Sequence, residues 1–251
     1  GAARRGGPDP GPARGRQGRE QARPRPQGRM THPVRSNYTQ ARENMVEQQV
    51  RPWDVLDARV LETLATLPRE AFVAETHRAL AYADLELPLG HGQSMMKPVV
   101  EGRTLQALKP QAGEDVLEIG TGSGYLTACL GNLAREVVSL EIHPELAAAA
   151  RARLDATGLG SNIRIDTADA LAWDTDRRFD VVCVTGAVAV VPARFLQWLR
   201  PSGRLFVVRG VSPVMEAVLH VNDVNGPRIE SLFETDLSYL VGAAPAPQFV
   251  F

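Results

Sequence analysis

The sequence has few cysteines, no long hydrophobic run and almost no net charge, and each shortage excludes a class of protein. Its 251 residues include only two cysteines, Cys129 and Cys183. Both stand inside apolar runs, which indicates buried thiols in a reducing compartment rather than a disulfide. No apolar run approaches the roughly 18 residues that span a membrane, and the N-terminus lacks the apolar centre of a signal peptide. We therefore expect a cytoplasmic protein without a membrane anchor.

The formal net charge of −1 is unevenly distributed along the chain. Residues 1–29 contain eight Arg but only Asp9 and Glu20 as acidic residues, so this segment carries +6 and the remainder −7. The larger part is therefore mildly acidic, which gives no reason to expect a nucleic-acid partner. We expect a monomer.

Residues 1–29 also differ from the rest in composition. Twenty of them are Arg, Gly or Pro, a mixture that cannot bury enough apolar surface to fold, so we expect a disordered leader. It is either an RNA-binding or targeting arm, or a non-native leader or misassigned start, because Met30 begins sequence of another character. The remaining divisions are a helical cap with a loop (30–110), an α/β core (111–240) and a tail (241–251).

Hydrophobic periodicity predicts an α/β protein. Apolar residues recur at three- and four-residue spacings over 39–67, which predicts helices that Pro52 and Pro68 interrupt. A loop bounded by glycine and proline follows at 87–98. Helical and strand patterns then alternate, with helices at 99–108, 123–132, 144–157 and 192–199 and strands at 115–119, 137–141, 163–167, 180–185 and 204–209. This alternation predicts a doubly wound, mostly parallel seven-stranded sheet, which an antiparallel hairpin at 215–221 and 229–240 completes.

A glycine-rich turn joins the strand at 115–119 to a helix. Gly120, Gly122 and Gly124 form the pattern G-x-G-x-G, whereas the dinucleotide fingerprint needs its third glycine one position later, at Tyr125. Glycine lets the backbone approach a ligand closely, and the following helix start offers unpaired N–H groups. The spacing therefore favours a nucleoside ligand without a pyrophosphate.

Acidic residues follow this turn in a pattern that suits S-adenosylmethionine better than NAD. Glu141 ends the next strand, where a carboxylate could accept both hydroxyl protons of a ribose. Asp169 could accept from an adenine amino group or cap residues 170–173. Glu118 stands near the expected sulfonium, or accepts loop N–H bonds as a strand-end carboxylate. We predict no metal site, and the predicted cofactor-binding residues are Glu118, Gly120, Thr121, Gly122, Ser123, Gly124, Glu141, Ile142, Asp169 and Ala170.

With these residues in place, the chain resembles the protein-L-isoaspartate O-methyltransferase family of class I methyltransferases over about residues 40–240. The segment 67–73 resembles the family's PRE-x-F-V, and 92–98 aligns without gaps on its G-Q-T-I-S-Q-P loop. The segment 139–146 resembles the ribose motif S-I-E-R-x-P-E-L, and 199–205 resembles L-K-P-G-G-R-L. The PRE segment and the GQ loop are the family-specific signals.

The resemblance implies methyl transfer from S-adenosylmethionine to the α-carboxylate of an L-isoaspartyl residue in a protein or peptide, which initiates repair. A carboxylate is already nucleophilic at pH 7, so alignment and exclusion of water would carry the catalysis. His91 and His143 are then loop and surface residues rather than bases.

The loop at 92–98 departs from the family pattern at two positions. Met96 stands where the family has its active-site serine, and Lys97 replaces a glutamine. Methionine cannot donate the lost hydrogen bond, and losing one such donor commonly costs about 10² to 10³ in rate. We predict Ser94 and Gln93 as catalytic residues and Met96, Lys97 and Thr185 as substrate-facing. Lys97 could attract a carboxylate or be a solvated surface residue.

Three functions remain open at this point. The first is an active isoaspartyl methyltransferase, and the second is a relative that methylates another acceptor. The third is a pseudoenzyme that binds the cofactor and acts as a sensor or interaction module.

Overall fold

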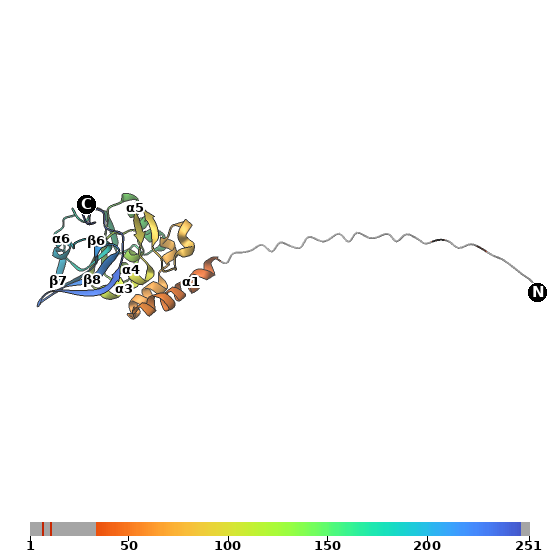
Figure 1. Ribbon diagram of the computed structural model, residues 1–251, viewed down its shortest axis with the longest axis horizontal. Helices are drawn as coiled ribbons and strands as arrows, with labels where there is room; N and C mark the ends of the chain where they lie inside the picture. Colours follow the sequence, from red (N-terminus) through yellow and green to blue (C-terminus); the bar gives the residue numbers. More distant parts are fainter. Residues whose placement is uncertain (1–6, 8–10, 12–33, 247–251) are drawn as a thin grey trace, which may run out of the picture. The chain divides into compact units, whose positions relative to one another are not determined.

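The computed structural model describes Gly7, Gly11 and residues 34–246, so most of the leader predicted to be disordered lies outside the described residues. A seven-stranded sheet in the order β5-β4-β3-β6-β7-β8-β9 forms the centre of residues 34–246 (Figure 1). Five neighbouring strands are parallel: β3 (Asp115–Ile119), β4 (Glu136–Glu141), β5 (Ile163–Thr167), β6 (Phe179–Val188) and β7 (Leu199–Val211). An antiparallel hairpin of β8 (Val214–Asp223) and β9 (Gly226–Thr235) extends the sheet beyond β7. The predicted fold class is confirmed.

Both faces of the parallel strands are covered, which explains why the middle of β3, β4 and β6 is mostly apolar. Alternate residues of β3 point to opposite faces, so that Val116 joins one core cluster and Leu117 the other. The N-terminal helices with α3 (Pro98–Leu108) and α4 (Tyr125–Leu133) contribute to the first cluster. The short α6 (Ala193–Gln197) contributes to the second with Phe195, next to Trp198. The helical cover is therefore unequal on the two faces.

Short helices precede the sheet, as the periodicity predicts. They are α1 (Val34–Met45), a π-helical turn (Val46–Val50), α2 (Ala58–Thr66) and 3-10 turns at Arg51–Trp53, Arg69–Phe72 and Glu75–Leu80. Asp57 starts α2 because its carboxylate accepts the backbone N–H groups of Arg59 and Val60. Helix α5 (Pro144–Thr157) begins at a proline and ends before Gly158, whose φ is 70°.

Two segments differ from the predicted elements, and both lie near the ends of the central strands. Residues 87–95, predicted as a loop, form a small antiparallel hairpin of β1 (Leu87–Gly90) and β2 (Gln93–Met95). Strand β9 ends at Thr235 instead of continuing to 240. Residues 236–243, which we call the C-terminal strap, run beside β6, where the Ala187 N–H donates to the Ser238 carbonyl at 2.9 Å.

The expectations for the two cysteines and for membrane-spanning segments can be compared with this structure. Cys129 and Cys183 are buried, free thiols, as predicted. Among residues 34–246, none of the helices combines the length and the apolar character needed to cross a bilayer.

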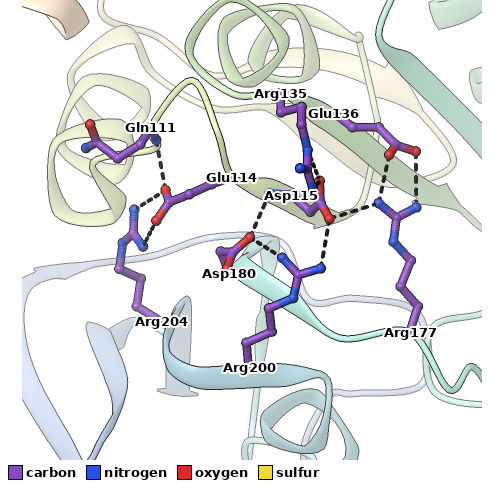
Figure 2. Close-up of polar contacts among 9 residues, drawn as sticks. All are labelled: Gln111, Glu114, Asp115, Arg135, Glu136, Arg177, Asp180, Arg200 and Arg204. Atoms are coloured by element: carbon purple, nitrogen blue, oxygen red, sulfur yellow. Dashed lines mark hydrogen bonds and ion pairs between the residues drawn. The ribbon is translucent and has the colours of Figure 1, made fainter.

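An ion-pair network fastens the N-terminal ends of the central strands (Figure 2). Asp115 starts β3, and its carboxylate accepts from Arg135 at 2.6 Å and from Arg200 at 2.9 Å, with Arg177 at 3.4 Å. Burial opposes ionisation of Asp115, but the hydrogen bonds from Arg135 and Arg200 outweigh it and hold its pKa below the ordinary value. Arg200 also contacts Asp180 at 2.5 Å, which ties β7 to β6.

Replacing Asp115 with asparagine is expected to lower the free energy of unfolding by about 3 kcal/mol, because three arginines lose a carboxylate that is only 4% exposed. A lowered folded-state pKa means that this contribution is present at neutral pH and is lost as pH falls through that pKa. In urea unfolding, the free energies of unfolding of the wild type and Asp115→Asn should therefore differ at pH 7 and become equal at acid pH. The control Asp166→Asn removes the exposed pair with Arg164 and should change the free energy by less than about 1 kcal/mol. Equal losses in both variants would contradict the role of the network.

Candidate active site

A pocket opens at the C-terminal ends of β3, β4 and β6, where the chain order of the sheet reverses. Parallel sheets bind ligands at such switch points because the loops after neighbouring strands diverge there. The pocket is lined by apolar side chains, two carboxylates and glycine backbone, a combination that suits a nucleoside-type ligand. Its lining brings together many of the predicted residues: Gln93, Ser94, Gly120, Gly122, Glu141, Ile142, Asp169, Ala170 and Thr185.

The glycine turn is packed too closely for side chains at its first position. Gly120 has φ of +94°, and a Cβ there would collide with the hydroxyl of Thr185. That hydroxyl donates to the Gly120 carbonyl at 2.6 Å and to the Ile119 carbonyl at 3.0 Å. Thr185 thus fixes the turn from β6 while lining the pocket beside it.

The other predicted residues of the turn, Thr121, Ser123 and Gly124, form contacts within the turn and its surroundings. The Thr121 and Ser139 hydroxyls are 2.6 Å apart, and the Ser123 hydroxyl accepts the Tyr125 N–H at 3.1 Å. Thr121, Ser123 and Gly124 are not among the residues that line the pocket. Gly124, with φ of 86°, provides the left-handed residue at the start of α4.

Glu141 is held with both carboxylate oxygens in fixed positions at the end of β4. One oxygen accepts the Gly122 N–H at 2.8 Å and the other the His143 N–H at 3.0 Å. Each carboxylate oxygen can accept a second hydrogen bond, and Glu141 lines the pocket. The arrangement can therefore bind two neighbouring hydroxyl groups of one ligand.

Asp169 stabilises a turn and also lines the pocket, and no helix begins at residues 170–173. Its side-chain oxygen accepts the Leu171 N–H at 2.8 Å, which caps the turn after β5. The residue also lines the pocket, where a carboxylate can accept from an amino group. Ile142, Leu146 and Ala170 provide apolar surface on the same part of the wall.

Glu118 does not line the pocket, contrary to the expectation that it lies near the ligand. Its side chain is fully buried on the α4 face of the sheet, where it accepts from the hydroxyls of Thr127 and Ser139, both at 2.6 Å. Burial raises the pKa of Glu118 to about 8, although the hydroxyls of Ser139 and Thr127 oppose the rise. The alternation of β3 is the cause, because Ile119 faces the pocket and Glu118 the opposite face.

The comparison with known proteins decides the family. Residues 39–225 match the family model described as Protein-L-isoaspartate(D-aspartate) O-methyltransferase (PCMT). The chain belongs to this family. It is 38% identical over 200 residues to protein-L-isoaspartate O-methyltransferase 2 of Marinobacter nauticus, a match that covers 79% of this chain and 91% of the relative. It is 40% identical over 193 residues to a protein-L-isoaspartate O-methyltransferase of Myxococcus xanthus, covering 75% and 91%.

Solved structures show the same fold at lower identity. A crystal structure described as that of a protein-L-isoaspartate O-methyltransferase of Plasmodium falciparum, in complex with S-adenosyl-L-homocysteine, superimposes with a TM-score of 0.69. It is 18% identical, and the alignment covers 81% of this chain and 97% of that chain. The predicted resemblance to the isoaspartate methyltransferase family is confirmed.

The two residues of the GQ loop that differ from the family pattern, Met96 and Lys97, both lie outside the pocket. Met96, at the position of the family serine, is 5% exposed and belongs to the hydrophobic core. Its carbonyl accepts from Arg69, of the PRE segment, at 2.7 Å. Lys97 is exposed and lines a neighbouring groove together with Glu86 and Asp236. The substrate-facing role expected for these two residues therefore has no support from this pocket.

Sequence reasoning missed the part of the pocket wall that the C-terminal strap provides. Leu240 and Val241 line the pocket, and the Gln93 amide donates to the Tyr239 carbonyl at 3.3 Å. The only signal is the apolar character of Leu237, Tyr239 and Leu240, which the predicted last strand, 229–240, includes at its end. Leu89, which also lines the pocket, lies outside the matched motifs, and His143 stands at the variable position of the ribose motif.

Proposed function

We propose that this protein transfers a methyl group from S-adenosylmethionine to the α-carboxylate of L-isoaspartyl residues in proteins and peptides, as a repair enzyme of the cytoplasm. Family membership supports the reaction, and the relatives at 38% and 40% identity are named for it. The observation that carries the cofactor is the carboxylate of Glu141, which two backbone N–H groups hold toward the pocket.

The residues present fit this cofactor. When bound, S-adenosylmethionine supplies a methyl group activated by a positive sulfur, and the S–C electron pair returns to the sulfur as the new C–O bond forms. Glu141 would bind the ribose hydroxyls, Asp169 the adenine amino group and Ile142 the adenine face. Gly120 and Gly122 would let the backbone approach the rest of the molecule.

The acceptor side of the pocket needs hydrogen-bond donors and apolar residues that exclude water more than it needs a general base. The acceptor carboxylate is ionised at pH 7, so no proton must be removed before it attacks. Ser94 can donate its hydroxyl and Gln93 its amide to that carboxylate, and both line the same pocket as Glu141. The strap residues Leu240 and Val241 would exclude water from the reacting atoms. We assign no role to Lys97, because it lines the neighbouring groove and not this pocket.

The test is methyl transfer to an isoaspartyl peptide beside its normal aspartyl twin. We expect transfer to the isoaspartyl peptide to be at least about tenfold faster, since Ser94 and Gln93 must meet a carboxylate at a fixed distance from the backbone. Ser94→Ala should lower kcat/KM by about 10² because one positioning donor is lost. Ser161→Ala, on the exposed α5–β5 connection, is the matched control and should leave the rate unchanged.

Met96→Ser tests where position 96 points. Because the side chain is packed in the core, serine there should lower the unfolding temperature without raising the rate. A gain in rate would place position 96 at the acceptor. Equal methylation of both peptides would indicate another acceptor, and cofactor binding without any transfer would indicate a binding protein.

A further inference from the structure

The β1–β2 hairpin forms a wall of the cofactor pocket as well as carrying the residues assigned to the acceptor. Leu89, Gln93 and Ser94 all line the pocket. Leu89 also packs on the glycine turn so closely that a Cβ at Gly122 would lie 3.0 Å from its Cδ1 atom. The hairpin therefore touches both halves of the site.

The tip of this hairpin is joined to the ribose side by two histidine rings. His91, at φ of 53°, stacks on His143 with ring centroids 4.1 Å apart and an interplanar angle of 17°. The backbone N–H of His143 is the group that holds one oxygen of Glu141, at 3.0 Å. The stack thus connects the hairpin tip directly to the residue that fixes the ribose-binding carboxylate.

The hairpin depends on such contacts for its position. Its strands span only Leu87–Gly90 and Gln93–Met95, and an isolated two-stranded hairpin of this length is marginally stable in water. At its other side, the Gln93 amide donates to the Tyr239 carbonyl of the strap. Without the stack, the hairpin would be held by the contact of Leu89 with the glycine turn and by the hydrogen bond of Gln93 to the strap.

The buried edge of the stack shows that the two rings are packed closely. The Nε2 atom of His143 is buried and, within residues 34–246, has no hydrogen-bond partner. The His91 Nε2 atom lies 3.9 Å from the Glu145 carboxylate, at the first turn of α5. The ring of His91 therefore holds its place mainly by stacking, a contact that another flat ring could reproduce.

We propose that His91 is a positioning residue: by stacking on His143 it couples occupancy of the cofactor site to the order of Gln93 and Ser94. The proposal rests on the proposed function for its acceptor side. A coupling of this kind is reciprocal, so the acceptor peptide must tighten cofactor binding by the same factor by which the cofactor tightens peptide binding.

Calorimetric titration of S-adenosylhomocysteine, with and without the isoaspartyl peptide, measures this coupling without turnover. We expect the peptide to tighten S-adenosylhomocysteine binding about fivefold in the wild type, in the range of two- to tenfold that an aromatic pair can contribute. In the absence of peptide, His91→Ala should bind S-adenosylhomocysteine about fivefold more weakly than the wild type. The factor by which the peptide tightens this binding should fall to about one. His91→Phe keeps a flat ring and should restore both values to within about twofold.

His77→Ala, which removes a histidine from the 3-10 turn Glu75–Leu80, is the control and should match the wild type. Unchanged S-adenosylhomocysteine affinity in His91→Ala would overturn the proposal, and so would equal losses in His91→Ala and His91→Phe. Failure of the wild type to bind S-adenosylhomocysteine would instead contradict the proposed function, whereas binding that the peptide does not tighten would overturn the proposed coupling. The unfolding temperature of each variant shows whether a loss comes from the fold.

Discussion

Replacing Arg69 with methionine is expected to lower the free energy of unfolding by about 4 kcal/mol, because it leaves Glu101 without a partner in the core. The two side chains are 0% and 2% exposed and form an ion pair. Arg69 also donates to the carbonyls of Ala81 at 2.8 Å and Met96 at 2.7 Å, and its guanidinium lies 4.9 Å from the ring centre of Tyr125. One residue thus joins the PRE segment, the GQ loop and the first turn of α4.

The pH dependence of this variant identifies the cause of the loss. Burial raises the pKa of Glu101, and Arg69 opposes the rise, so the pKa should rise further in Arg69→Met. A carboxyl with a raised folded-state pKa stabilises the fold below its unfolded value, and this contribution is lost as pH rises through the folded value. The deficit of Arg69→Met relative to the wild type should therefore grow between pH 5 and pH 8, as measured by urea unfolding.

A double-mutant cycle separates the ion pair from the two carbonyl contacts. Arg69→Met with Glu101→Met should recover about half of the loss, because an apolar pair replaces the charges while the two carbonyls stay unpaired. Arg51→Met is the control, since its pair with Glu47 is exposed, and it should change the free energy by less than about 1 kcal/mol. A loss in Arg69→Met that is independent of pH and is not relieved in the double variant would contradict an unpaired Glu101.

The parts of the fold that local sequence determines were predicted closely. The bounds of β3, β5 and α5 agree with the predicted 115–119, 163–167 and 144–157. Each is an apolar or periodic run between residues that end it, such as Pro144 and Gly158 around α5. The β1–β2 hairpin and the strap could not be read in this way, since Tyr239 pairs with Ala187 across a long stretch of chain.

The candidate site was predictable to a similar degree and for the same reason. Gly120, Glu141 and Asp169 lie at or just after strand ends, and these ends of a parallel sheet meet at one edge, so their positions in the sequence predicted that they lie together. Glu118 and Met96 were assigned from their places in motifs. Which face a side chain takes depends on strand alternation and on contacts such as Arg69 with the Met96 carbonyl, and a motif does not record these.

Removing the carboxylate of Glu141 is expected to have the largest effect on cofactor binding. Glu141→Ala should weaken S-adenosylmethionine binding about 100-fold, because the two charge-assisted hydrogen bonds that we propose it makes to the ribose hydroxyls would be lost together. Glu141→Gln should lose nearly as much affinity for S-adenosylmethionine. Both carboxylate oxygens accept backbone N–H groups, from Gly122 and His143, so the amide NH2 of glutamine would have to face one of these donors.

Comparing two ligands assigns this effect to the ribose rather than to the charge of the sulfonium. S-adenosylmethionine and S-adenosylhomocysteine share the ribose and differ in sulfur charge, so a ribose contact must weaken both by the same factor. Titration calorimetry on Glu141→Ala measures the two factors, and Glu230→Ala on β9, far along the sheet order from β4, is the control. A loss confined to S-adenosylmethionine would show that Glu141 acts on the positive sulfur, and affinity within threefold of the wild type for both ligands would remove Glu141 from the cofactor site.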